Sequence, residues 1–177
     1  LRKIGTPLHD MSGPQSFVAL QSDFDGPFPA GLRYYWKSLY LDDLSDETIE
    51  AIVERSVERP SDMTFIPIRH LGGAVARVAD AETAVANRQA PYLLSIDNAW
   101  ADPAADERNI AWVRAFWDAM RAHSQGGVYL NFAGLKDEGA AVTKAGHRAN
   151  FDRLAALKAA YDPDNVFRLN QNVPPRA

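Results

Sequence analysis

The chain has 177 residues, of which 46% are hydrophobic and 24% are charged, and its formal net charge is −4. This length suits one domain, and these proportions are ordinary for a soluble globular protein. The negative charge gives no electrostatic reason to expect nucleic acid or an anionic membrane as a partner, and no apolar run approaches the length of a membrane span. The absence of cysteine excludes disulfides, thiolate metal sites and cysteine nucleophiles. The compartment stays open, with the cytoplasm as the default expectation.

The first part of the chain predicts turns and two strands before its first long helix. Residues 1–33 are rich in Gly and Pro, which mark turns, and 17–21 is a plausible short strand among them. An aromatic-rich stretch predicts a longer strand over 33–41. Ser45 is placed to cap the helix that follows, because its side chain can accept a hydrogen bond from a free backbone N–H, and Pro60 ends that helix.

The middle of the chain predicts three more strands and a second long helix. Strands are expected at 63–70 and 74–78, joined by two glycines, and at 92–99. Asp102 and Pro103 are typical of a helix start, with a capping acid before a proline at the first helical position. The helix after them has an amphipathic stripe, whose apolar members are Ile110, Val113, Phe116, Trp117 and Met120.

The last third predicts a strand at 128–132 and a helix over roughly 149–161. Asp162 and Pro163 should stop this helix, because proline disfavours the helical conformation of the residue before it. The turn that follows is expected to aim Phe167 into a core. Because strands and helices do not alternate strictly along the chain, the sequence predicts an α+β fold in which helices cover one face of an antiparallel β-sheet.

A series of motifs in the last third carries a family resemblance. It comprises Gly126-Gly127-Val128-Tyr129-Leu130-Asn131-Phe132, Asn150-Phe151-Asp152-Arg153-Leu154, Lys158, Tyr161-Asp162-Pro163-Asp164-Asn165-Val166-Phe167 and Asn170-Gln171-Asn172-Val173-Pro174-Pro175. In this order the motifs resemble the C-terminal segment of the berberine bridge enzyme-like FAD-linked oxidases, which runs Tyr-x-Asn-Tyr/Phe, Tyr-Gly-x-Asn-Tyr-x-Arg-Leu, Lys-x-x-Tyr-Asp-Pro-x-Asn-x-Phe and Gln-x-Ile-Pro. Softer similarities extend the resemblance over roughly residues 5–175.

The resemblance implies a domain organisation and a cofactor. Residues 1–177 would form a single substrate domain of a vanillyl-alcohol-oxidase-type flavoprotein, with residues 126–175 as its berberine-bridge-like C-terminal segment. The sheet would form a roof over the isoalloxazine of FAD, which a domain absent from this chain would bind. Relatives oxidise an alcohol, sugar or amine C–H by hydride transfer to flavin, so the chain alone is expected to be inactive. With no cysteine, it cannot itself form a cysteinyl–flavin bond.

The C-terminal motifs supply candidates for catalysis and cofactor binding. Tyr129 is a candidate catalytic residue, and Asn131 and Asn172 are candidates for contact with FAD. In many relatives the second Tyr of Tyr-x-Asn-Tyr is the base or part of it, but the matching Phe132 cannot accept a proton. On a strand, Tyr129 and Asn131 would share a face. That face would look onto flavin or substrate, or it would be solvated or contact another domain.

The strand predicted at 92–99 supplies a second candidate base. Asp97 and Ser95 share one of its faces, and an acidic base of plant relatives lies on what resembles this strand. The resemblance therefore makes Asp97 a candidate catalytic residue, and Ser95, on the same face, a candidate substrate-binding residue.

Further substrate-binding candidates lie earlier in the chain. Tyr35 and Lys37 belong to the aromatic strand, which could line a pocket or fill a core. His70 precedes two glycines that permit close backbone approach to a ligand, although it could equally be an ordinary turn histidine. The four histidines show no ligand spacing, so no metal site is predicted.

Two other readings of the sequence stay open. One is a cofactor-free α+β binding module, perhaps a homodimer through its sheet, without redox activity. The other is a substrate-domain polypeptide that assembles with a separate FAD-binding chain. The expected partners are therefore a small-molecule substrate and an FAD-binding domain, in the same chain or in another, with no nucleic acid and no membrane.

Overall fold

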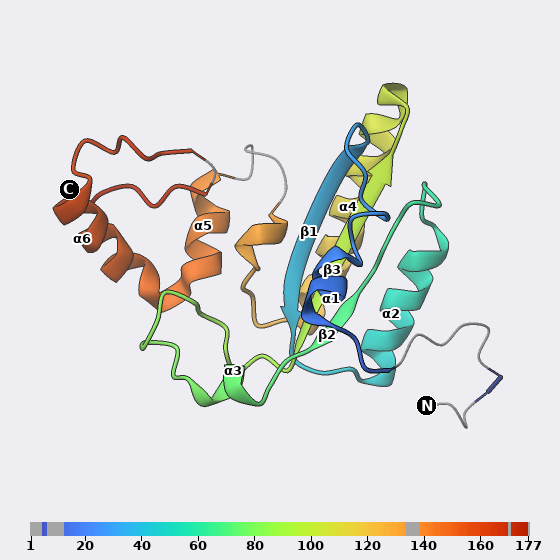
Figure 1. Ribbon diagram of the computed structural model, residues 1–177, viewed down its shortest axis with the longest axis horizontal. Coiled ribbons are helices and arrows are strands. Elements are labelled where there is room, and N and C mark those ends of the chain that lie inside the picture. The colour runs from blue at the N-terminus through green and yellow to red at the C-terminus, as the bar shows by residue number, and fades with distance from the viewer. Residues whose placement is uncertain (1–4, 7–12, 134–138, 170, 177) are drawn as a thin grey trace. The chain divides into compact units, whose positions relative to one another are not determined.

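A computed structural model describes residues 5–6, 13–133, 139–169 and 171–176 (Figure 1). The chain divides into two compact units, Leu1–Leu32 and Arg33–Ala177. The first unit contains α1 (Phe17–Ser22), so the strand predicted at 17–21 is wrong. The reason is local: the Ser16 hydroxyl accepts a hydrogen bond from the Ala19 N–H at 3.2 Å, which caps and starts a helix.

A three-stranded antiparallel sheet is the centre of the second unit. Its order is β1 (Arg33–Leu41), β3 (Tyr92–Trp100) and β2 (Ile68–His70), which confirms the α+β prediction and the strands expected at 33–41 and 92–99. The strand predicted at 63–70 is shorter than expected, with an isolated bridge between Phe65 and Asp97 before β2. The strand predicted at 74–78 is wrong, because these residues form helix α3 (Ala74–Arg77).

Helices cover one face of this sheet, as predicted. Ser45 caps α2 (Asp46–Val57), and Asp102 caps the short 3-10 helix η1 (Pro103–Ala105) that leads into α4 (Asp106–Met120). Alternate residues of β1 and β3 point toward these helices, because successive strand side chains face opposite ways. The resulting core contains Tyr35, Leu39, Leu41, Ile52, Leu94, Ile96, Trp100, Val113, Phe116 and Met120.

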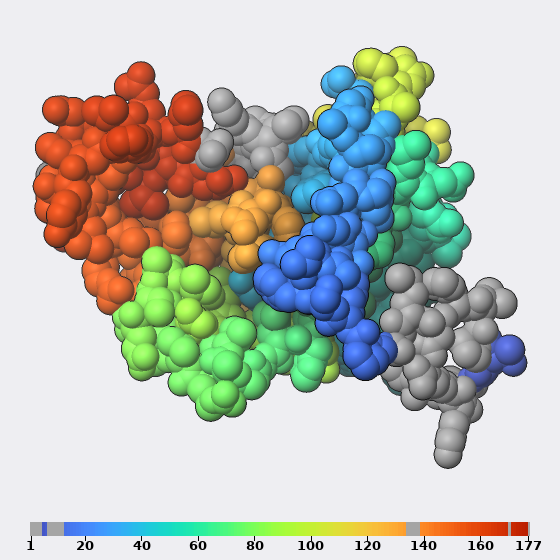
Figure 2. All heavy atoms as spheres, in the orientation of Figure 1, coloured from blue at the N-terminus to red at the C-terminus, as the bar shows by residue number. Residues whose placement is uncertain are grey.

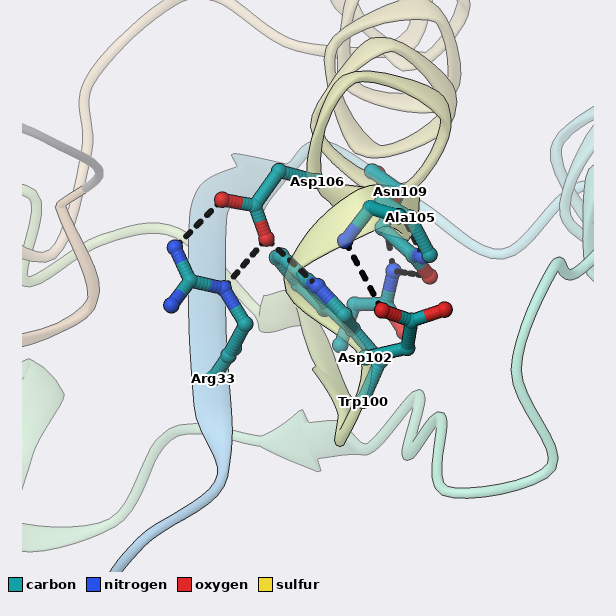
Figure 3. A network of polar contacts seen from close by, with 8 residues as sticks. Arg33, Trp100, Asp102, Ala105, Asp106 and Asn109 are labelled. Atoms are coloured by element: carbon teal, nitrogen blue, oxygen red, sulfur yellow. Dashed lines mark hydrogen bonds and ion pairs between the residues drawn. The ribbon is translucent and has the colours of Figure 1, made fainter.

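A polar network fixes the start of α4 to the ends of β1 and β3 (Figure 3). Arg33 donates to both carboxylate oxygens of Asp106, and Trp100 Nε1 donates to the same carboxylate at 2.8 Å. The hydrogen bond from Arg33 holds the pKa of the Asp106 carboxyl below its usual range. Deeper in the core, Asn98 Nδ2 donates to Asn109 Oδ1 at 2.9 Å. These contacts set the register of α4 on the sheet.

Short helices connect the sheet to the C-terminal segment. They are η2 (Arg121–His123), η3 (Leu130–Phe132), α5 (Gly139–His147), η5 (Arg148–Asn150) and α6 (Phe151–Tyr161). The helix expected near 149–161 is therefore confirmed, whereas the strand predicted at 128–132 is wrong. Ser38 Oγ accepts from the Tyr129 N–H at 3.1 Å and donates to the Tyr129 carbonyl at 3.2 Å. The Ser38 side chain of β1 thus pairs with the backbone N–H and C=O of Tyr129, which a neighbouring strand would pair with if this segment were a strand.

The C-terminal segment, at the red end of the colour bar in Figure 2, carries large exposed apolar side chains in and after α6. Asp162 ends the helix and accepts from the Val166 N–H at 2.8 Å, while Lys158 bonds both Asp162 and the Phe167 carbonyl. Phe167 is 82% exposed, so the prediction that it enters a core is wrong. The largest exposed apolar side chains here are Leu157, Tyr161, Val166, Phe167 and Leu169. We refer to these five residues as the C-terminal apolar patch.

Candidate functional site

The candidate site lies on the sheet face opposite α4. Trp36 is the cross-strand partner of Asp97, and Ser38 is the partner of Ser95, so these four side chains share one face. Arg69 of β2 pairs with Leu93 and belongs to the same face. Three strands and the loop at η3 therefore bring residues from four distant parts of the sequence together.

The Asp97 carboxyl is the chemically distinctive group of this face. The residue is 3% exposed, and Ser95, which is fully buried, donates from Oγ to Asp97 Oδ1 at 2.7 Å. Burial raises the pKa of Asp97 to about 6, while the Ser95 hydrogen bond and the Arg69 charge oppose that rise. A carboxyl with a pKa near neutrality can accept a proton at physiological pH and release it again.

Arg69 links this carboxyl to the loop at η3. Its Nη1 donates to Ser95 Oγ at 3.4 Å, and its guanidinium carbon lies 5.0 Å from the centre of the Phe132 ring. This placement is typical of a cation–π contact. The positive charge is thereby held beside the Ser95–Asp97 pair without a direct ion pair to Asp97.

An aromatic cluster forms the rim of the site. The Phe132 ring meets Trp36 at 5.8 Å and Tyr129 at 5.1 Å between ring centres, both edge to face. Asn131 Nδ2 donates to the Tyr129 hydroxyl at 2.9 Å, and Asn131 is exposed. Tyr129 and Asn131 are therefore neighbours, although they do not alternate on a strand as the sequence predicted.

The structure separates two predicted substrate-binding residues from this face. Tyr35 is 2% exposed and lies on the α4 side of the sheet, where Arg114 Nε donates to its hydroxyl at 3.1 Å. Lys37 lies on the same side, with Nζ 4.1 Å from the centre of the Trp117 ring. The period of two in a strand explains this outcome, because Trp36 and Ser38 alternate with them and face the other way. Tyr35 and Lys37 therefore lie on the opposite face of the sheet from Ser95 and Asp97.

The remaining predicted residues lie apart from Asp97. His70 ends β2, is exposed and has its ring 5.3 Å from that of Tyr92. Asn172 is half-buried in the segment after α6. Neither residue is brought into contact with the Ser95–Asp97 pair by any hydrogen bond of the described residues.

The buried Asp97 carboxyl predicts an unusual pH dependence of stability. Its pKa in the folded chain, about 6, exceeds the value of about 3.9 expected when unfolded, so the folded state retains a proton that the unfolded state loses. Stability due to this group is therefore lost as pH rises from about 4 to about 6. We expect Asp97→Asn to raise the free energy of unfolding by up to about 3 kcal/mol at pH 8 and to change it little at pH 4.

Urea unfolding of both variants between pH 4 and pH 8 measures this difference. Asp62→Asn, at an exposed position, is the matched control and should show no comparable trend. A stability difference for Asp97→Asn that stays constant across this range would show that the carboxyl is not buried at a cost.

Comparison with known proteins gives the same assignment as the motifs. Residues 128–174 match the family model described as "Berberine and berberine like". The FAD-linked oxidoreductase YgaK of Bacillus subtilis (strain 168) is 28% identical over 178 residues, covering 99% of this chain and 39% of that protein. Hexose oxidase of Chondrus crispus is 23% identical over 198 residues, covering 96% of this chain and 36% of that protein. The crystal structure of aclacinomycin oxidoreductase has the same fold, with a TM-score of 0.73 and 23% identity over 89% of this chain and 36% of that chain.

The chain is thus similar to berberine bridge enzyme-like FAD-linked oxidoreductases, and residues 128–174 carry the segment that the family model describes. It spans less than half the length of the relatives it matches. The relatives that it matches include FAD-linked oxidoreductases, and the similarity extends over a part of each of them.

Three residues of the site were not predicted from the sequence. Arg69, Trp36 and Ser38 reach the Asp97 face through strand pairing and through contacts with the η3 loop. The sequence did place Arg69 in the strand predicted at 63–70, where its side chain points to the face opposite that of its neighbour His70. Nothing in the sequence indicated, however, which side of that strand would meet Asp97.

Within the part of the chain that the structure describes, no three His, Asp or Glu side chains are grouped so as to hold a metal ion. Among the helices of that part, none combines the length and apolar character that crossing a bilayer requires.

Proposed function

We propose that this chain supplies the substrate-side part of an FAD-dependent oxidoreductase, in which Asp97 removes a proton from an alcohol, sugar or amine as the adjacent C–H is oxidised. The observation that carries the proposal is the buried Asp97 carboxyl, with its pKa raised to about 6 and Ser95 donating to one of its oxygens. Proton transfer is most efficient when the pKa of the base lies near the working pH.

The residues at the rim of the site fit a flat aromatic cofactor. Trp36, Tyr129 and Phe132 form an aromatic cluster, and the exposed Asn131 adds amide hydrogen-bonding groups beside it. The sequence has no Gly-rich phosphate loop, so the phosphates and adenine of FAD would be held elsewhere. FAD bound beside this face would supply the acceptor for the substrate hydride. This chain would then position the substrate and take up the proton.

Proton removal falls to Asp97 because of what surrounds it. Phe132, at the position where many relatives carry the base, has no group that accepts a proton, and it contacts Arg69 through its ring face. Ser95 holds only Oδ1 of Asp97, and no described residue donates a hydrogen bond to Oδ2. Oδ2 is thus the oxygen that would receive the substrate proton.

The C-terminal apolar patch supports a domain contact. Tyr161 is 85% exposed and Leu169 is 78% exposed, and contiguous exposed apolar side chains commonly mark interaction sites. We assign this patch to contact with an FAD-binding domain, in the same polypeptide or in a separate chain. The small-molecule substrate would meet the cofactor between that domain and the Asp97 face.

The test starts from the longest natural product that contains this chain. Mass spectrometry and a visible absorption spectrum should show a heavier polypeptide with bound flavin. Anaerobic addition of sugars, alcohols and amines should then bleach the flavin for one of these classes. A colourless product of 177 residues that takes up no FAD and gains none from a companion chain would contradict the proposal and favour a cofactor-free binding module.

A further inference from the structure

We infer that Arg69 and Ser95 are positioning residues for Asp97, an inference that rests on the proposed function. Arg69 fixes the direction of the Ser95 hydroxyl, and that hydroxyl fixes one oxygen of Asp97, so that the other oxygen is presented to the substrate.

The direction of this hydrogen-bond chain follows from the donors available. A guanidinium has only N–H donors, so the Ser95 oxygen must accept from Arg69 Nη1. The single hydroxyl proton of Ser95 is then free to point to Asp97 Oδ1, 2.7 Å away. An ionised carboxylate only accepts hydrogen bonds, which matches this arrangement, whereas a protonated one would compete as a donor. The chain Arg69–Ser95–Asp97 therefore favours the ionised base.

Arg69 is held for this role by the loop at η3. Its guanidinium lies over the Phe132 ring at 5.0 Å, and the Phe132 ring is fixed in turn by Trp36 and Tyr129. In the described part of the chain, no carboxylate forms an ion pair with Arg69. The positive charge of Arg69 therefore stabilises the ionised form of Asp97 without competition from another carboxylate among the described residues.

The other groups facing Asp97 do not carry a compensating charge at neutral pH. From β1, Tyr34 and Trp36 share its face, and Phe65 pairs with it across the isolated bridge. From the η3 loop, Tyr129 and Phe132 lie along the rim. Arg69 is therefore the cation that opposes the effect of burial on this carboxyl, together with the Ser95 hydroxyl.

The inference is tested by titrating Asp97 directly in the longest natural product that contains this chain. Aspartate labelled with ¹³C at the side-chain carboxyl gives one resonance per residue, and the Asp97 signal is the one lost in Asp97→Asn. We expect its midpoint to rise by about one pH unit in Ser95→Ala and in Arg69→Met, because each removes an interaction with the charged form. Arg69→Lys, which retains the charge but not the planar donor pair, should fall between wild type and Arg69→Met.

Two features make the test decisive. Ser56→Ala is the matched control, because the Ser56 hydroxyl donates to the Ile52 carbonyl within α2 and contacts no residue of the Asp97 face, so its Asp97 midpoint should equal that of wild type. If Ser95→Ala fails to fold, Arg69→Met still tests the inference, because Arg69 is only half-buried and its replacement should be tolerated by the fold. A midpoint unchanged in Arg69→Met overturns the inference, as does one unchanged in a folded Ser95→Ala.

The titration also separates this inference from the proposed function, since it needs neither substrate nor turnover. A product without flavin or oxidase activity would refute the proposed function while the Asp97 midpoints still report on Arg69 and Ser95. In an active product, the acidic limb of the pH profile for flavin reduction should move upward in the same two variants. A loss of rate without a shift of that limb would indicate a purely structural role.

Discussion

We expect Asp97→Asn to lower the rate of substrate-dependent flavin reduction by about 10²- to 10⁴-fold, the usual contribution of a positioned general base. Asparagine preserves the size of the side chain and its ability to accept from Ser95, but it cannot take up a proton at this pH. Anaerobic stopped-flow absorbance of the bound flavin, in the longest natural product that contains this chain, measures the effect. The largest ratio should appear at pH 8, where the wild-type carboxylate is ionised.

Tyr129→Phe is the informative comparison for this experiment. It removes the phenol hydroxyl that accepts from Asn131 Nδ2 and leaves the ring contact with Phe132. If Asp97 is the base, this change should cost far less than Asp97→Asn. A near-wild-type rate in Asp97→Asn together with a large loss in Tyr129→Phe would transfer the role of base to Tyr129.

The second large effect concerns stability. We expect Phe116→Ala to lower the free energy of unfolding by about 3–5 kcal/mol, because it removes a buried ring and leaves a cavity between α4 and the sheet. Phe116 is fully buried, and its ring centre lies 5.5 Å from that of Trp112 in the same helix. Urea unfolding followed by circular dichroism on the 177-residue chain measures the change.

Val57→Ala is the control for the core substitution. Val57 belongs to α2 but is 76% exposed, so its truncation should change stability by no more than about 0.5 kcal/mol. Equal losses for the two variants would mean that Phe116 does not anchor α4 to the sheet.

Local signals predicted the elements whose ends are fixed by their own side chains. Ser45 and Asp102 each cap the helix expected after them, and Asp162 ends α6. The alternation along 92–99 placed Ser95 and Asp97 on one face, which the register with β1 confirms. In these cases the physical cause is a contact within a few residues, so it is visible in the sequence.

Three strand predictions were wrong because a strand needs a neighbouring strand to pair with, and the sequence does not reveal which segments pair. Residues 17–21 and 74–78 each form a short helix, and 128–132 is a loop with one turn of 3-10 helix. β-branched and apolar residues favour strands only when a neighbouring strand accepts their hydrogen bonds. For 128–132 the β1 side chain of Ser38 supplies those bonds instead.

The sequence by itself indicated the resemblance to berberine bridge enzyme-like oxidases, through its C-terminal motifs, and the α+β class. It also placed the candidate acid on a strand face beside Ser95. Only the tertiary structure decided which residues lie near Asp97. Arg69 and the Phe132 ring lie on its side of the sheet. Tyr35 and Lys37 instead contact residues of α4 on the other side. Strand register and loop docking depend on contacts between segments tens of residues apart. The chemistry of the face was therefore fixed by packing rather than by local pattern.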